Sequence, residues 1–126
     1  MTVSNSVFTI PGLIAAATQA SNQYKVMQLC STAGQIKIGT SATSKVIGIL
    51  QNDPAAGEPA EVQFLGVAKA LTEASVVVGD ALACSSTGRV KASTTGGDRL
   101  LGFALDAAGA AGDLIRVALA VSVNGD

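Results

Sequence analysis

Residues 30–49, CSTAGQIKIGTSATSKVIGI, return with substitutions as residues 84–103, CSSTGRVKASTTGGDRLLGF. The end of the same unit, AAGEPAEVQF (55–64), returns as AAGDLIRVAL (110–119). A chain rich in Ala and Gly produces about three identities over such a length by composition alone. The two copies share ten: Cys30/Cys84, Ser31/Ser85, Gly34/Gly88, Lys37/Lys91, Thr40/Thr94, Gly48/Gly102, Ala55/Ala110, Ala56/Ala111, Gly57/Gly112 and Val62/Val117. The sequence therefore predicts an internal repeat, at about 30–64 and 84–119, that supplies a scaffold.

Both copies have the pattern of an all-β domain. From Tyr24 onward, short apolar runs alternate with clusters of Gly, Ser, Thr, Asn and Asp. In GQIKIG and GRVKAS a buried-type residue, Ile36 or Val90, precedes an exposed-type Lys, which is the period-two pattern of a half-buried strand. KVIGILQ and RLLGFAL are apolar on both faces and are expected to be central strands. We expect strands over 24–30, 34–39, 45–51, 61–69, 88–93, 99–105 and 113–123.

Glycines punctuate these strands at matching places. Gly48 and Gly102 lie inside the twin central strands, where glycine marks a bulge or a close approach of two backbones. We expect them to bend the sheet toward closure. Gly57 and Gly112 end the turns that follow, at positions suited to a positive φ, and Gly79-Asp80 makes the turn into the second copy. The predicted fold is a compact barrel-like or β-tulip-like all-β domain.

The first 22 residues differ from the rest. Residues 1–12 are expected to form an extended arm with Pro11 and Gly12 as its hinge, and the block LIAAATQAS favours one or two helical turns over 13–20. Another helical turn is possible at 71–75. The expected organisation is an N-terminal arm, residues 1–22, and a single β domain, residues 23–126.

The composition excludes several classes of function. Charged residues make up 13% of the 126 residues and the net charge is −1, so the clustered Lys and Arg that nucleic-acid binding requires are missing. No apolar run approaches the ~20 residues needed to cross a bilayer, and the N-terminus lacks the pattern of a signal peptide. We expect a protein of a cytosol-like compartment. Its two cysteines, Cys30 and Cys84, would be small buried hydrophobic residues, or else a disulfide across the two copies.

The sequence also lacks the usual equipment of an enzyme. There is no histidine, the commonest general base and metal ligand near neutral pH, and no phosphate-binding loop. The nine acidic residues lie mostly at strand starts and turns. We expect no catalysis, no metal, no cofactor and no small-molecule substrate.

The pattern GVAKALTEASVVVGDALACSSTGRVKA followed by GDRLLGFALDAAGAAGDLIRVAL resembles the small capsid cement or head-decoration proteins of tailed bacteriophages. The resemblance covers about residues 24–121 and is carried by Gly79-Asp80, Gly88-Arg89-Val90, Gly102 and Gly112-Asp113. It implies a β-rich protomer, a homotrimer, that is assembled in the host cytoplasm and sits on the outer surface of the virion. There it would bind the major capsid protein and hold neighbouring capsomers together.

Under this interpretation the arm pairs its backbone with a capsid strand, and its apolar side chains fill pockets. The candidate capsid-binding residues are Val3, Val7, Phe8, Ile10 and Pro11; the alternative for the arm is a disordered terminus. The alternative for the whole chain is a non-viral binding or carrier module, a small β-barrel that holds a partner domain or an apolar ligand.

Overall fold

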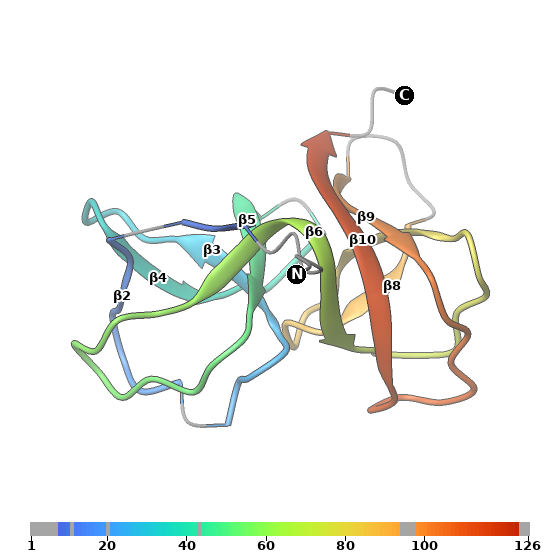
Figure 1. The fold of residues 1–126 in the computed structure, drawn as a ribbon, viewed down its shortest axis with the longest axis horizontal. Coiled ribbons are helices and arrows are strands. Elements are labelled where there is room, and N and C mark those ends of the chain that lie inside the picture. The colour runs from blue at the N-terminus through green and yellow to red at the C-terminus, as the bar shows by residue number, and fades with distance from the viewer. Residues whose placement is uncertain (1–7, 11, 20, 43, 94–97, 124–126) are drawn as a thin grey trace, which may run out of the picture.

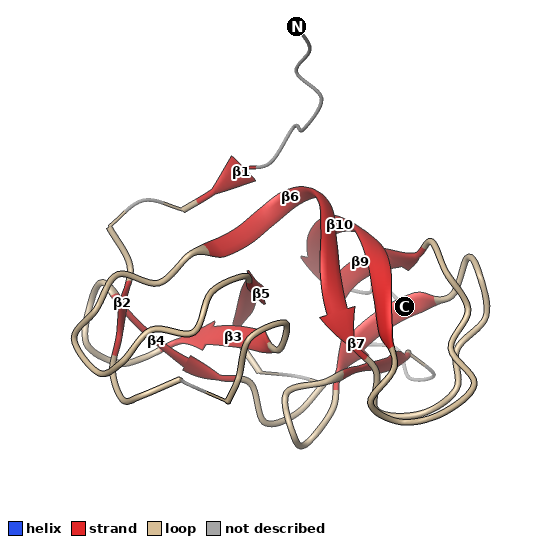
Figure 2. Cartoon of the chain, turned by 60° about the horizontal axis from the view of Figure 1, so that its bottom comes forward, coloured by secondary structure: helices blue, strands red, loops and turns tan. Residues whose placement is uncertain are grey.

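The computed structural model describes residues 8–10, 12–19, 21–42, 44–93 and 98–123, except for the side chains of residue 8 and of residues 121–123. This part of the chain consists of strands and loops without a helix (Figure 2). The all-β class is therefore confirmed. The strands are β1 (Phe8–Thr9), β2 (Ile14–Ala15), β3 (Val26–Leu29), β4 (Gln35–Ile38), β5 (Val46–Leu50), β6 (Val62–Leu71), β7 (Ala81–Cys84), β8 (Val90–Ala92), β9 (Arg99–Ala104) and β10 (Leu114–Val123).

All ten strands belong to one sheet, in the order β2-β4-β3-β5-β6-β10-β9-β7-β8, with β1 paired to β6 beside this path. The sheet is mixed, because β2 runs parallel to β4. Its path does not close into a barrel, so the closure expected around the bend glycines, Gly48 and Gly102, is not observed. Instead, single bridges bring each end of the path back to an end of β6: Ile14 pairs with Pro59, just before β6, and Val90 with Thr72, just after it.

The long strand β6 divides the molecule into two halves (Figure 1). The N-terminal half contains β2–β5 and the start of β6, and the C-terminal half contains the rest of β6 with β7–β10. In the first, β3 lies between β4 and β5; in the second, β7 lies between β8 and β9. The strand pairings of the two halves correspond. Met27 pairs with Ile38 and Gly48, just as Leu82 pairs with Ala92 and Gly102. Leu50 pairs with Val62, just as Ala104 pairs with Val117.

The cysteines show where the two halves differ. Leu29 pairs with Ile36, and Cys84 pairs with Val90, so Cys84 matches Leu29 in the sheet and not Cys30. Between the paired residues the second connection is one residue shorter, because residues 85–89 separate Cys84 from Val90 whereas residues 30–35 separate Leu29 from Ile36. Both thiols are free, so the alternative of a disulfide between Cys30 and Cys84 is wrong. Burial raises the pKa of the Cys84 thiol to about 11, and its sulfur donates to the Ser85 carbonyl at 3.2 Å.

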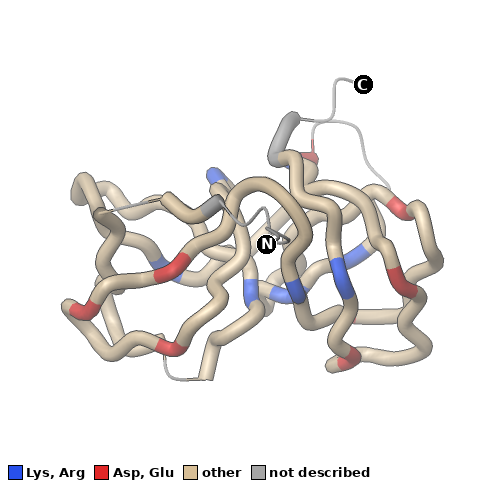
Figure 3. Tube along the Cα trace, in the orientation of Figure 1, with Lys and Arg blue, Asp and Glu red and all other residues tan. Residues whose placement is uncertain are grey.

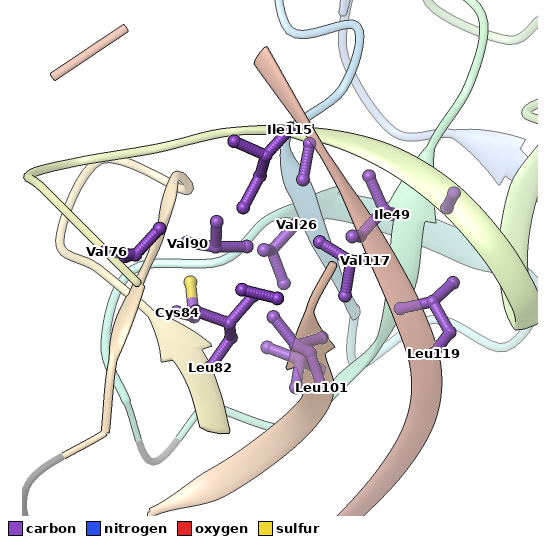
Figure 4. Close-up of a cluster of buried hydrophobic side chains, with 14 of the residues drawn as sticks. Val26, Ile49, Val76, Leu82, Cys84, Val90, Leu101, Ile115, Val117 and Leu119 are labelled. Atoms are coloured by element: carbon purple, nitrogen blue, oxygen red, sulfur yellow. The ribbon is translucent and has the colours of Figure 1, made fainter. Parts of the chain in front are cut away.

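One hydrophobic core joins the halves. Val26, Val46 and Ile49 of the N-terminal half are buried in this core with side chains of the C-terminal half. Figure 4 shows Val26 and Ile49 beside Val117 and Leu101. This shared core consists of Val26, Val46, Ile49, Ala68, Ala70, Val76, Leu82, Cys84, Val90, Leu101, Ala104, Ala108, Ile115, Val117 and Leu119. Backbone bonds support the junction, since Val26 N donates to Gly88 O at 2.7 Å.

A second core fills the N-terminal half alone. It consists of Leu13, Ala15, Met27, Ile36, Leu50, Ala60 and Val62, with Ile10, Ile38 and Ile47 packed against it. Neighbouring residues of β3 and β5 therefore point into different cores, as Val26 and Met27 do. This is why KVIGILQ is apolar on both faces.

The helical turns expected at 13–20 and 71–75 are wrong. Leu13 and Ala15 are buried while Ile14 is exposed, and Ala15 N donates to Glu58 O at 3.1 Å across the fold. Likewise Thr72 N donates to Asp113 O at 2.9 Å. Because short helices are marginal in water, bonds to neighbouring strands outweigh the local helix propensity of these segments.

Gly48 and Gly102 lie where two backbones come close together. A Cβ on Gly48 would lie 2.2 Å from the Gln63 carbonyl oxygen, and one on Gly102 would lie 1.9 Å from that of Ala118. Gly102 also has a φ of 151°, a region that favours glycine. A register shift follows each site, after Met27 in β3 and after Leu119 in β10. These glycines allow the adjacent strands to approach each other.

We predict that Gly48→Ala and Gly102→Ala each destabilise the fold by about 2–3 kcal/mol, because a single methyl group forces rigid backbone to move. Gly102→Ala is expected to be the worse of the two, since it adds backbone strain. Urea unfolding followed by circular dichroism measures both. Gly109→Ala is the matched control, since its Cβ would meet nothing within 4 Å. Variants as stable as this control would show that no close approach exists.

Candidate functional site

The described residues of the expected arm are bound to the fold. Val3, Val7 and Pro11 lie outside the described residues, as do the other residues of 1–7. Phe8 pairs with Leu65 of β6, and Ile10 N donates to Val62 O at 3.1 Å. The Ile10 side chain packs against the N-terminal core. Ile10 is therefore partly engaged in this chain's own packing, and its role as a capsid-binding residue stays a prediction.

The turn glycines lie in open space. Gly57, Gly79 and Gly112 have φ values of 83°, 93° and 87°, and a Cβ on any of them would meet nothing within 4 Å. Their left-handed backbone, and not a lack of room, is what favours glycine there. These three residues lie at turns.

The groups with shifted pKa values have structural roles. Glu73 accepts hydrogen bonds from the hydroxyls of Thr87 and Ser85, and these bonds lower the pKa of its carboxyl. Asp106 forms a bidentate pair with Arg116, with bonds of 3.0 and 2.8 Å, which lowers the pKa of that carboxyl to about 2. Each carboxylate is held ionised by its neighbours, so neither is poised to exchange a proton near neutral pH.

The described part of the chain contains no group of three or more Cys, Asp or Glu side chains that could hold a metal ion. Nor does it contain a helix long and apolar enough to cross a membrane. Charges are sparse: acidic positions lie mainly on outer loops, and basic positions mainly toward the middle of the view (Figure 3). What the surface offers instead is apolar area.

Part of that apolar area lies on the outer face of β6, β10 and β9. Leu65 pairs with Ala120, and Val67 pairs with Ala118, which in turn pairs with Phe103. Residues that pair directly across antiparallel strands project to the same face. We call Leu65, Val67, Phe103, Ala118 and Ala120 the open face. Leu65, Val67 and Phe103 are 43%, 51% and 54% exposed. Apolar patches of this kind commonly mark interaction sites.

The next row of the same sheet is charged. Lys69 pairs with Arg116, and both are exposed. Arg116 is compensated by Asp106, whereas Lys69 has no ion-pair partner among the described residues. The open face is thus bordered on one side by a cationic row.

Reasoning from the sequence did not identify this face. RLLGFAL has the same apolar pattern as KVIGILQ, and both strands were expected to be buried on both sides. Leu101 is buried as expected, but Phe103 is not. The pattern specifies which residues are apolar, and it does not say whether anything covers them.

Two of three comparisons relate this chain to known proteins. A search of curated proteins found no match. Among solved structures, the N base of head fiber gp8.5 of bacteriophage phi29 is similar, with a TM-score of 0.67 and 17% sequence identity over 95% of this chain and 98% of that one. At this identity the likeness concerns the fold alone. The family model for phage cement proteins matches residues 13–119. With most of its length matched, the chain belongs to the phage cement protein family.

Proposed function

We propose that this protein is a capsid decoration protein that binds the outer surface of a phage head and stabilises contacts between capsomers. The match to the phage cement family over residues 13–119 is the observation that carries this proposal. Membership makes the role a structural one associated with the phage capsid.

The architecture suits a load-bearing block. The two halves share one core, so a force applied to one half is carried directly to the other. We further propose that the halves arose by duplication, as their matched registers suggest, and that the protein acts as a homotrimer. A trimer that engages several capsid subunits at once gains from effective concentration, so each single contact can be modest.

The proposal includes no catalysis, no nucleic acid and no small-molecule ligand. It is supported by the ionised, structurally engaged carboxylates and by the low charge of the chain. The site of action would be the virion, after assembly in the host cytoplasm. Because the family is one of phage proteins, the non-viral carrier module is set aside.

For the arm, we propose that residues 2–7 contact the capsid, with Val3 and Val7 as apolar anchors. Phe8 and Ile10 are held on β6 and the N-terminal core, and they would fix the point from which the arm leaves the fold. Residues 2–7 and residues 8–10 therefore have separable roles.

The direct test uses shells of the major capsid protein from the same phage, prepared without this protein. We predict saturable binding in co-sedimentation, together with an increase in the temperature at which the shells break, because bridged capsomers separate less easily. Bovine serum albumin at equal concentration serves as the control. Binding that leaves shell stability unchanged would contradict the cement role, and absence of binding would contradict the proposal as a whole.

A second prediction concerns the arm. Deleting residues 2–7 should leave the melting temperature unchanged and reduce occupancy on shells, since it removes contacts and spares β1. Deleting residues 2–11 is the matched comparison: it also removes the β1 pairing and Ile10, so the melting temperature should fall as well. Full occupancy on shells by the variant that lacks residues 2–7 would show that these residues do not contribute to capsid binding.

A further inference from the structure

A row of side chains crosses three strands at the same place in each half. In the N-terminal half the row is Val26 on β3, Ile49 on β5 and Gln63 on β6. In the C-terminal half the row is Ala81 on β7, Phe103 on β9 and Ala118 on β10. The two rows occupy equivalent positions, because the pairings of the two halves keep the same register. We call them the first row and the second row.

The first row is completely covered. Val26 and Ile49 are 0% exposed and Gln63 is 2% exposed. The cover is the C-terminal half of the same chain: in Figure 4, Val26 and Ile49 lie among Val117, Val90 and Ile115. The one polar side chain of the row is satisfied internally, since Gln63 Nε2 donates to the carbonyls of Leu65 and Val67 at 3.0 and 2.9 Å.

The second row has no such cover within the described part of the chain. Phe103, the counterpart of Ile49, is 54% exposed, and Ala81 and Ala118 are half-buried. The row continues across β6 to Val67, which is 51% exposed, so it forms the centre of the open face. Among the described residues, the aromatic ring of Phe103 is thus exposed at the position where the first half buries Ile49.

We propose that the open face is the surface through which copies of this chain associate, with Phe103 and Val67 of each copy packed against another copy. The inference names the contact behind the proposed homotrimer, and it rests on the proposed function only in expecting several copies to act together. The occupant follows from the internal precedent, since the equivalent row of the first half is buried by an apolar surface of this same chain.

The chemistry of the face favours a second copy. Leu65, Val67, Phe103, Ala118 and Ala120 carry no side-chain hydrogen-bonding group, so the same faces of three copies that meet around one axis can cover each other without leaving a buried polar atom unpaired. Even the glutamine of the first row is replaced here by Ala118. Lys69 and Arg116 occupy the adjacent row, where like charges of different copies can stay solvated at the rim.

Sedimentation velocity of the full chain tests this, with the double variant Phe103→Thr/Val67→Thr. Threonine is a β-branched residue that strands favour, and it removes apolar surface from the contact. We expect the wild type to self-associate and the variant to associate at least about 30-fold more weakly, as is typical when central anchors of an interface are lost. Val77→Thr/Val78→Thr is the matched control, because those valines are 62% and 65% exposed and lie in a loop outside the open face.

Circular dichroism melting accompanies each sample, so that loss of association is not mistaken for loss of fold. Weakened association in a folded open-face variant, with the loop control unchanged, would support the inference. A wild type that is monomeric at its highest soluble concentration would overturn it, as would an open-face variant that associates as strongly as the wild type. Shell binding is scored separately: a self-associating protein that ignores shells would refute the proposed function and leave this inference standing.

Discussion

Burial of Val26, Val46 and Ile49 beneath the C-terminal half is the interaction on which the rest of the structure depends. Burying one such side chain contributes about 1.5–3 kcal/mol. Separating the halves would expose all three, at a cost comparable to the whole stability of a typical domain, about 5–15 kcal/mol. The chain therefore cannot behave as two independent modules on a tether. It forms a single block whose two ends are held at a fixed distance.

The strand β6 makes this arrangement possible. It pairs with β5 at its start and with β10 along the rest of its length, and both ends of the sheet return to its flanks through single bridges. The bend glycines let neighbouring backbones pass close by at equivalent points of both halves. The same geometry has an asymmetric outcome, because the first half is covered by the second and nothing in the described chain covers the second in turn. The described part of the chain thus leaves an apolar surface exposed on its second half, which suits a protein that works by contact.

Much of the fold could be predicted from the sequence, because alternation in GRVKAS and apolar runs such as KVIGILQ directly reflect burial in strands. Strand β7 was missed, since ALAC is short and its small residues carry little pattern. LIAAATQAS was misread as helical, because its short β2 depends on distant partners that local propensity cannot reveal. The open face could not be predicted either: Phe103 and Ile49 occupy matching positions, and only the three-dimensional order of the halves makes one exposed and the other buried.

The central claim, that both halves unfold as one unit around a shared core, is tested most directly by native-state hydrogen exchange in increasing urea. The slowest amides of β5 in the N-terminal half are compared with those of β9 in the C-terminal half. A shared core predicts one opening free energy and one denaturant dependence for both strands. If β5 opens at a clearly lower free energy while β9 stays protected, the halves are separable and the account is contradicted.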